Sequence, residues 1–259
     1  MAEGDSILRI ARRLDETLAG QVLSVRTPGP RRPSGLPAAE LDGRVLERAE
    51  SRGKHLLLHF EGETTLHSHL GMRGSWHIYA DGDRWRRPAH QAWIALAGDG
   101  AEAVNFGGST MRIAREGQLR RDPRLARLGP DLLAEDFDVD LGVRGLRRAG
   151  PEPEIGDALL DQGLIAGIGN IFKSEGCFAV GLDPHRRMGS LSDDELAALL
   201  TATRELMLVA VRTGRQPGLI HRSAGRPCPR CGTTIRSRAQ GDAARVTYWC
   251  PRCQPAGPG

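Results

Sequence analysis

Residues 228–253 read CPRCGTTIRSRAQGDAARVTYWCPRC, and this stretch determines how the C-terminal part of the chain can fold. Two Cys-Pro-Arg-Cys motifs are separated by 18 residues, which is inside the range of zinc-binding C-x2-C pairs. Four thiolates at this spacing can close a tetrahedron around Zn²⁺ and leave no position open for water. Two disulfides are the alternative, and a reducing cytosolic environment disfavours them. We predict one structural zinc ion, held by Cys228, Cys231, Cys250 and Cys253.

The basic residues of the chain concentrate around these motifs. From Arg215 to Gly259 there are eight arginines and one acidic residue, Asp242, so this segment carries +7 and the remainder of the chain sums to −3. A basic segment attached to a nearly neutral body favours a polyanionic partner, and a solubilising surface is the alternative. The strand that ends in TYWC is expected to form half of a hairpin and to present Arg245 near its turn.

The rest of the sequence indicates an α+β fold built from several parts. Apolar residues recur at helical spacing over 6–20, where Asp5 or Ser6 can cap the start and Gly20 the end. Short apolar runs punctuated by turn residues over 21–113 predict a β-sandwich or barrel, and the second half is helical. We therefore predict four parts: an N-terminal β-sandwich with its leading helix (1–120), a linker (121–145), a helical domain (146–215) and a zinc finger (216–259).

Composition also bears on location. No window of the 259 residues approaches the apolar length of a membrane helix, and the N-terminus has no apolar leader. We expect a cytoplasmic protein without a membrane partner.

The stretch LIAGIGNIFKSE, residues 164–175, is a second candidate site. Gly167 and Gly169 let the backbone approach a ligand closely, and Asn170 is expected to cap a helix whose free N–H groups favour an anion. A phosphate of a nucleic acid would fit there. A plain tight turn between packed helices is the alternative.

Lysine is scarce in this chain, with 34 arginines against Lys54 and Lys173. Lys54 begins an apolar strand, where its amine can reach a phosphate or a substrate oxygen, and a solvated lysine at a strand end is the alternative. His67 and His69 share one face of a strand without an evident third metal ligand, so we interpret them as structural. Cys177 is expected to be a small buried hydrophobic residue.

The N-terminus MAEGDS offers reactive chemistry. Removal of the initiator methionine would leave Ala2 first, with an α-amine of pKa about 8 against about 10.4 for lysine. The positive end of the following helix would lower that pKa further, so the amine is a potential Schiff-base nucleophile. Glu3 lies beside it and can move protons. An ordinary N-terminus with an acidic residue at a helix start is the alternative.

The chain resembles the bacterial formamidopyrimidine-DNA glycosylase / endonuclease VIII family in six motifs that follow the family's order: MAEGDS, SRGKHLLL, HSHLGMRGSW, LGPDLLAEDFD, ALLDQGLIAGIGNIFKSE and the CPRC…TYWCPRCQ finger. A four-cysteine finger is common, whereas the ordered set is highly specific and covers nearly the whole chain. MAEGD and the finger resemble the endonuclease VIII-like branch more than the 8-oxoguanine branch. The resemblance implies a β-sandwich, then a helical domain with a helix–two-turn–helix element and a zinc finger, with DNA in the cleft between the halves.

The resemblance also implies roles for individual residues. The amine of Ala2 would attack C1′ of a damaged nucleotide flipped from the stack, and Glu3 would act as the acid on the sugar. Lys54 would bind near the lesion phosphate or sugar, and Met72 would fill the gap left by the flipped base. The two phosphate-gripping residues next to the lesion would be Asn170 and Arg245.

The chain departs from the family's pattern in three places. Position 2 is usually proline, whose iminium must keep its charge, whereas Ala2 gives an imine that can lose its proton and is a weaker electron sink. We therefore expect slower lyase activity that stops more often after β-elimination. Ser6 stands where many members have Glu. Residues 104–114, VNFGGSTMRIA, replace a PRRFG-like loop that normally supplies an Arg and a Phe for the opposite strand.

These observations predict a DNA repair enzyme that acts as a monomer on double-stranded DNA with damaged bases or abasic sites. It would be a glycosylase for oxidised bases, with pyrimidines favoured, and an abasic-site lyase. A non-catalytic damaged-DNA or abasic-site binding protein that has lost the proline nucleophile is the alternative. A zinc ribbon fused to an unrelated β-domain is a third hypothesis, but it does not explain the ordered motifs.

Overall fold

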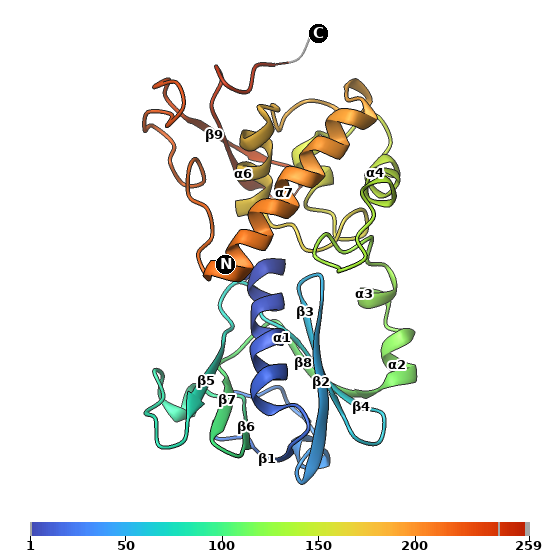
Figure 1. The fold of residues 1–259 in the computed structure, drawn as a ribbon, viewed down its shortest axis with the longest axis vertical. Coiled ribbons are helices and arrows are strands. Elements are labelled where there is room, and N and C mark those ends of the chain that lie inside the picture. The colour runs from blue at the N-terminus through green and yellow to red at the C-terminus, as the bar shows by residue number, and fades with distance from the viewer. Residues whose placement is uncertain (1, 243, 257–259) are drawn as a thin grey trace. The chain divides into compact units, whose positions relative to one another are not determined.

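The structure, a computed structural model, describes residues 2–242 and 244–256, and the chain divides into two compact units, Met1–Ala126 and Arg127–Gly259. The first unit is built from strands with one long helix at its start (Figure 1). Its elements are α1 (Gly4–Leu18), β1 (Val22–Arg26), η1 (Ala38–Glu40), β2 (Arg44–Arg52), β3 (His55–Phe60), β4 (Thr64–His69), β5 (Trp76–Ala80), η2 (Ala89–Gln91), β6 (Ile94–Gly98), β7 (Ala101–Asn105), β8 (Thr110–Arg115), α2 (Glu116–Arg120) and α3 (Pro123–Ala126).

The eight strands form two antiparallel halves, in the orders β5-β7-β6-β1 and β2-β3-β4-β8. A short pairing of β1 with β2, Val22 with Val45 and Leu23 with Arg44, joins the halves. One hydrophobic core contains side chains of α1 and of every strand, including Leu14 of the helix. The alternation of apolar and polar residues along the strands places one face of each half on this core. This arrangement confirms the predicted N-terminal β-sandwich.

Helix α1 starts earlier than the sequence predicts. The N-cap is Glu3 and the C-cap is Ala19, so the prediction that Asp5 or Ser6 caps the start and Gly20 the end is wrong. The cause is the backbone: the carbonyl of Glu3 already accepts from the amides of Ser6 and Ile7 at 3.0 and 3.2 Å. Of the apolar positions at helical spacing, Ile7, Ala11, Leu14 and Leu18 are buried, and Ile10 packs on the core partly buried.

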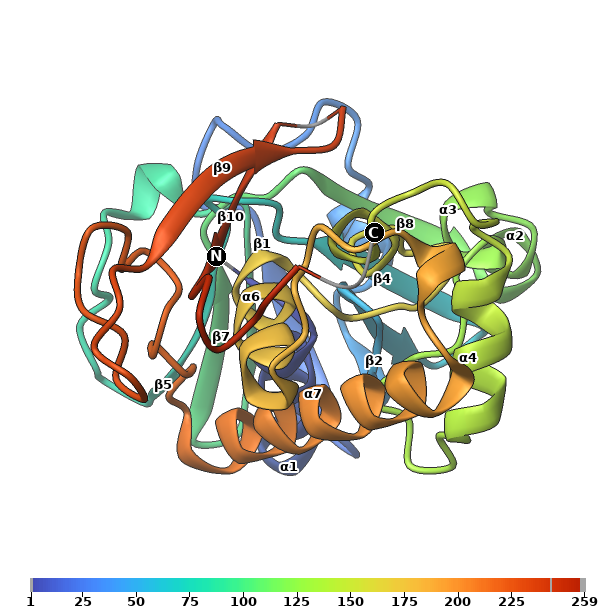
Figure 2. The same ribbon diagram turned by 90° about the horizontal axis from the view of Figure 1, so that it is seen from above.

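The second unit is helical and ends in a hairpin (Figure 2). Helix α7 packs against both α6 and α4, and turns over residues 159–164 separate α5 from α6 in the predicted helix–two-turn–helix element. The elements are α4 (Val139–Arg147), α5 (Ile155–Ala158), α6 (Asn170–Val180), η3 (Met188–Ser190), α7 (Asp193–Thr213), β9 (Arg236–Gln240) and β10 (Arg245–Trp249). The α+β class is confirmed.

Local sequence signals explain the ends of α7. The hydroxyl of Ser192 accepts from the amide of Glu195 at 3.1 Å, and the Glu195 carboxylate accepts from the amide of Ser192 at 2.8 Å. This capping box satisfies two amides that have no partner inside the helix. Gly214 ends the helix with φ 69°, a left-handed conformation that favours glycine.

The predicted four-part division stays a prediction, because compactness divides the chain only once, between residues 126 and 127. Helices α2, α3 and the start of α4 occupy much of the segment between 116 and 145, which the sequence presents as charged and Arg-rich. Among the described residues, no helix is both long and apolar enough to cross a membrane.

Candidate active site and zinc centre

Ala2 and Glu3 lie at the N-terminal end of α1, against the core of the first unit. Ala2 is partly buried and packs on the core, and Glu3 is fully buried, with 0% of its surface exposed. A carboxylate in such a position is shielded from bulk water. The two predicted catalytic residues are consecutive in the sequence, and both directly precede Gly4, the first residue of α1.

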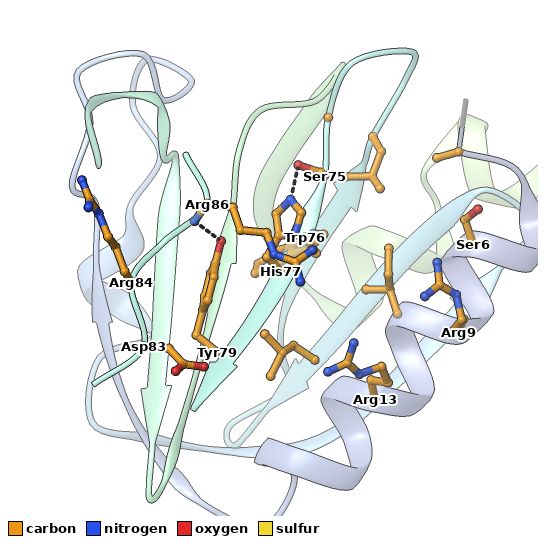
Figure 3. Close-up of a pocket in the computed structure, with 15 residues that line it drawn as sticks. Ser6, Arg9, Arg13, Ser75, Trp76, His77, Tyr79, Asp83, Arg84 and Arg86 are labelled. Carbon is orange, nitrogen blue, oxygen red and sulfur yellow. Dashed lines mark hydrogen bonds between the residues drawn. The ribbon is translucent and has the colours of Figure 1, made fainter. Parts of the chain in front are cut away.

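A pocket of about 640 Å³ opens in the same unit, between α1 and the segment from Leu70 to Arg86. Ala2 and Ser6 line it at the start of α1, and Arg9 and Arg13 line it further along the helix. Figure 3 shows Arg9 and Arg13 on the helix side and His77, Tyr79 and Arg86 on the strand side.

The lining of the pocket is cationic. Arg9, Arg13, Arg84 and Arg86 face it together with one carboxylate, Asp83, and none of these arginines forms an ion pair with another described residue. Burial, and then the charges of Arg86 and Arg87, lower the pKa of His77, so this imidazole is neutral at pH 7 and does not add to the charge. The arrangement suits a ligand that is rich in hydrogen-bond acceptors or negatively charged.

Lys54 stands in the tight turn between β2 and β3, directly after Gly53 at φ 58°. The prediction that Lys54 begins the strand is wrong, because β3 begins at His55 and Lys54 belongs to the turn. Its charge acts on His69, whose pKa is lowered mainly by burial and then by Lys54. His69 is paired with His55 across β3 and β4, so the turn presents a cation beside a group of histidines.

His67 is fully buried, as expected for a structural residue. Burial lowers its pKa to about 4, and burial lowers the pKa of His55 to about 3, so both rings are neutral at pH 7. His55 and Arg112, which contact His67 and His69, were not predicted from the sequence. Alternation along three neighbouring strands could have shown that these four side chains share a face.

Met72 occupies the turn that follows β4, and 64% of its surface is exposed. Gly71 has φ 59°, and a Cβ on Gly74 would meet the carbonyl oxygens of Gly107 and Leu70 at 2.5 and 2.6 Å. Both glycines are therefore needed for the close turn in HLGMRG. The turn holds a large apolar side chain outward, which is a suitable shape for insertion into a base stack.

The four cysteines of the finger converge. All four Sγ atoms lie within 4.8 Å of one another, with Cys228 and Cys253 at 3.9 Å and Cys231 and Cys250 at 3.5 Å. Zn–S bonds of about 2.3 Å in a tetrahedron put sulfur atoms about 3.8 Å apart, so these residues fit Zn²⁺. Backbone amides of Arg230 and Cys253 point at Sγ atoms, which would stabilise thiolates. These cysteines hold one structural zinc ion.

Asn170 starts α6, but its N-cap is Gly169, so the prediction that Asn170 caps the helix is wrong. The side chain is used differently: Nδ2 of Asn170 donates to the carbonyl of Val246 at 2.9 Å. Val246 follows Arg245, which is the first residue of β10. Arg245 therefore lies next to the turn of the hairpin, as the sequence predicts. The structure thus brings Asn170 beside the strand that carries Arg245.

Two residues of α6 that the sequence analysis did not assign hold the finger to the helices. Lys173 is fully buried, and its amine donates to Thr247 at 2.6 Å and to Gln240 at 3.3 Å. Glu175 is also buried, and its carboxylate accepts from the amides of Ile220 and His221 at 3.0 and 2.9 Å. The scarcity of lysine in this Arg-rich chain was the available sequence signal for Lys173. Cys177 is buried as predicted, and burial raises its pKa to about 12.

Comparison with known families and proteins gives consistent matches along the chain. Residues 1–108 match the N-terminal domain of formamidopyrimidine-DNA glycosylase, residues 128–219 its helix–two-turn–helix domain, and residues 225–256 the zinc finger found in that enzyme and in isoleucyl-tRNA synthetase. A probable endonuclease 8 2 of Streptomyces coelicolor is 42% identical, over 100% of this chain and 95% of its own length. A DNA-(apurinic or apyrimidinic site) lyase Nei2 of Mycolicibacterium smegmatis is 33% identical over 99% and 100%.

Solved structures show the same fold. The MutM (Fpg) protein of Thermus thermophilus has a TM-score of 0.80 and 32% identity, over 99% of this chain and 100% of that chain. The Lactococcus lactis Fpg, solved with DNA that contains N7-benzyl-Fapy-dG, has a TM-score of 0.82 at 22% identity, over 98% and 100%, which supports the fold alone. With three domain families matched in order and full-length relatives above 30% identity, the chain belongs to the formamidopyrimidine-DNA glycosylase / endonuclease VIII family.

Proposed function

We propose that this protein removes oxidised bases, pyrimidines above others, from double-stranded DNA and then cleaves the abasic site through the amine of Ala2, as a monomer. The broader activity, a DNA glycosylase with abasic-site lyase activity in DNA repair, is that of the family to which the chain belongs. The observation that carries the proposal is the position of Ala2 at the rim of a cationic pocket, next to the buried carboxylate of Glu3.

The proposed chemistry uses these two residues in turn. The neutral Ala2 amine attacks C1′, the N-glycosidic bond breaks, and the base leaves with the proton that the amine gives up on bonding to carbon. Glu3 gives a proton to the ring oxygen of the sugar as the ring opens and the Schiff base forms. Loss of a proton from C2′ then expels the 3′ phosphate, which is β-elimination, and water releases the sugar from Ala2. The dipole of α1 favours the neutral amine because positive charge is disfavoured at its N-terminal end.

The pocket supports oxidised bases as substrates. Oxidation adds carbonyl and hydroxyl oxygens to a base, and guanidinium groups are strong donors to such acceptors. Arg9 and Arg86 are donors on opposite sides of the pocket (Figure 3). Ser6, where many relatives have Glu, adds a small hydroxyl at the end near Ala2 and removes a negative charge from it. These features favour acceptor-rich rings.

Four further residues would bind the DNA itself. Lys54 would contact the phosphate or sugar of the lesion, and the exposed side chain of Met72 would occupy the gap left by the flipped base. In the second unit, Asn170 and Arg245 would hold the phosphates that flank the lesion. Nδ2 of Asn170 has two hydrogens and the bond to Val246 uses one, so the other can reach an anion.

A panel of duplexes, each with one lesion, tests the proposal when base release and strand nicking are scored separately. The expected result is release of oxidised pyrimidines, with nicking that is slower than release and ends mainly at the β-elimination product. Release of no base from any duplex, together with tight binding to abasic DNA, would favour the binding protein that Ala2 in place of proline suggests. Retained Met1 in the intact mass would point the same way.

A further inference from the structure

The face of the β2-β3-β4-β8 half that is turned away from the core carries a chain of polar side chains across three strands. His55 stands opposite His69, and His67 stands opposite Arg112, so all four side chains lie on one face of β3, β4 and β8. We call His55, His67, Arg112 and Asp122 the histidine relay. Nothing in the proposed chemistry uses its inner members.

The contacts of the relay determine which nitrogen carries each proton. Nε of Arg112 donates to Nδ1 of His67 at 3.1 Å, and a guanidinium has donors only. Nδ1 of His67 must therefore be the unprotonated nitrogen, and a neutral imidazole then has its proton on Nε2. A second nitrogen of the same guanidinium is bound to Asp122, which fixes the orientation of Arg112.

The protonation of His67 in turn fixes that of His55. Nε2 of His67 lies 2.8 Å from Nδ1 of His55, so the His67 proton is donated to Nδ1 of His55. Nδ1 of His55 must accept, and its own proton is on Nε2. Burial and the charges of Arg112 and Arg124 disfavour a second proton on either ring. His55 is therefore held as one neutral tautomer.

The outer nitrogen of His55 is available to a ligand. His55 is partly exposed, and within the described part of the chain its Nε2 makes no hydrogen bond and is not a buried atom. The ring centroid of His69 lies 4.8 Å from that of His55, and the charge of Lys54, the residue before His55, acts on His69. Arg124 is exposed and its charge acts on all three histidines. The nearby carboxylate, Asp122, is buried and already bound to Arg112.

We propose that Asp122, Arg112 and His67 fix His55 as the Nε2–H tautomer, so that His55 donates a hydrogen bond to a phosphate oxygen of DNA beside Lys54. His55 is the contact residue, and His67 and Arg112 are positioning residues. The choice of DNA as the ligand rests on the proposed function, whereas the tautomer does not. A neutral donor adds affinity at a phosphate without releasing a counterion, which separates its contribution from that of Lys54.

The tautomer is tested first, by ¹⁵N-detected imidazole spectra of the full-length, zinc-loaded protein without DNA. Both His55 and His67 should be protonated at Nε2 and unprotonated at Nδ1. A proton on Nδ1 of either ring would overturn the relay. In Arg112→Met/Asp122→Asn, a pair that removes the donor without leaving a buried charge, His67 and His55 should both become mixtures of tautomers.

The contact is tested by affinity for a duplex that contains a tetrahydrofuran abasic analogue, measured from low to high salt. His55→Phe should weaken binding about three- to tenfold at every salt concentration, with an unchanged salt slope. Lys54→Met should instead make the slope less steep by about one unit. His55→Gln, which keeps a donor, should retain most of the affinity. Arg120→Gln, an exposed arginine beside Glu116, is the matched control for loss of charge.

These outcomes distinguish failure of the proposed function from failure of the His55 contact. Wild-type protein that does not bind the duplex at all would reject the proposed function and leave the tautomer result standing. Normal wild-type binding with full affinity in His55→Phe would reject the contact. A changed salt slope in His55→Phe would also reject it, because that result requires His55 to be charged when DNA is bound.

Discussion

The zinc finger and the histidine relay each gather polar side chains at one place, but they are held together in different ways. The finger takes its ligands from two short motifs on one hairpin, and its geometry follows from their spacing. The relay takes its members from β3, β4, β8 and the start of α3, and its geometry follows from strand register. A site of the first kind can be read from sequence, whereas a site of the second kind requires the fold.

The largest expected effect concerns the finger. Cys250→Ser should abolish stoichiometric zinc and unfold the hairpin, because binding of a structural zinc ion contributes on the order of 10 kcal/mol to such a module. We expect DNA affinity to fall at least about 100-fold, with the β-sandwich still folded. Metal content and binding to an abasic-analogue duplex check this. Cys177→Ala is the matched control and should keep one zinc; loss of zinc there would contradict the assignment.

The next effect concerns the proposed acid. Glu3→Gln keeps the size and the N-cap position of the side chain and removes its proton chemistry. Base release should slow by about 10²- to 10⁴-fold, with the melting temperature within a few degrees of wild type. Single-turnover assays on a lesion duplex measure the rate. An unchanged rate would remove Glu3 from the chemistry.

Lys173 of α6 links the finger to the helices, so replacing it tests how much the stability of the second unit depends on this link. Lys173→Met removes a buried amine that donates to Thr247 and Gln240, so the free energy of unfolding of the second unit should fall by about 2–4 kcal/mol. Denaturant unfolding with zinc present is the measurement, and Arg212→Met on the end of α7 is an exposed control. Equal stability of the two variants would show that the lysine does not tie the parts together.

The smallest expected effect concerns the relay and depends on pH. The pKa of His67 is about 4 in the folded protein against an ordinary 6.5, so the unfolded chain binds more protons between these values. Stability of the first unit should therefore decline as the pH falls from 6.5 towards 4, by about 1–2 kcal/mol at pH 5 for this residue. Thermal melts of wild type and His67→Gln measure it, and equal pH dependence of the two would contradict the pKa. Glu50, whose pKa is lowered first by the ring of His59 at 3.4 Å from its carboxylate, loses its contribution only below its ordinary 4.5.

Much of the fold could be predicted because its signals are local. The capping box of Ser192 and Glu195 predicts the start of α7, and the alternation of apolar residues predicts the strands. The start of helix α1 was misplaced because Glu3, rather than Asp5 or Ser6, has the extended backbone of an N-cap. No side-chain hydrogen bond marks that cap, so no sequence signal was available.

The candidate site could be predicted only in part. The cysteines, the N-terminus and Lys54 stand out by residue type and spacing. Arg112, His55 and the pocket arginines do not, because arginine is abundant in this chain and its use depends on neighbours far away in sequence. The role expected of Asn170 as a helix cap was wrong because Gly169 has the extended backbone instead.

The central claim is that a nitrogen at the start of α1 bonds to the sugar. Borohydride trapping on an abasic-site duplex, followed by peptide mass spectrometry of the adduct, tests it most directly. The account predicts a covalent complex whose modified peptide begins at Ala2 and carries the sugar on its α-amine. An adduct on Lys54, or no adduct from protein shown to lack Met1, would contradict it.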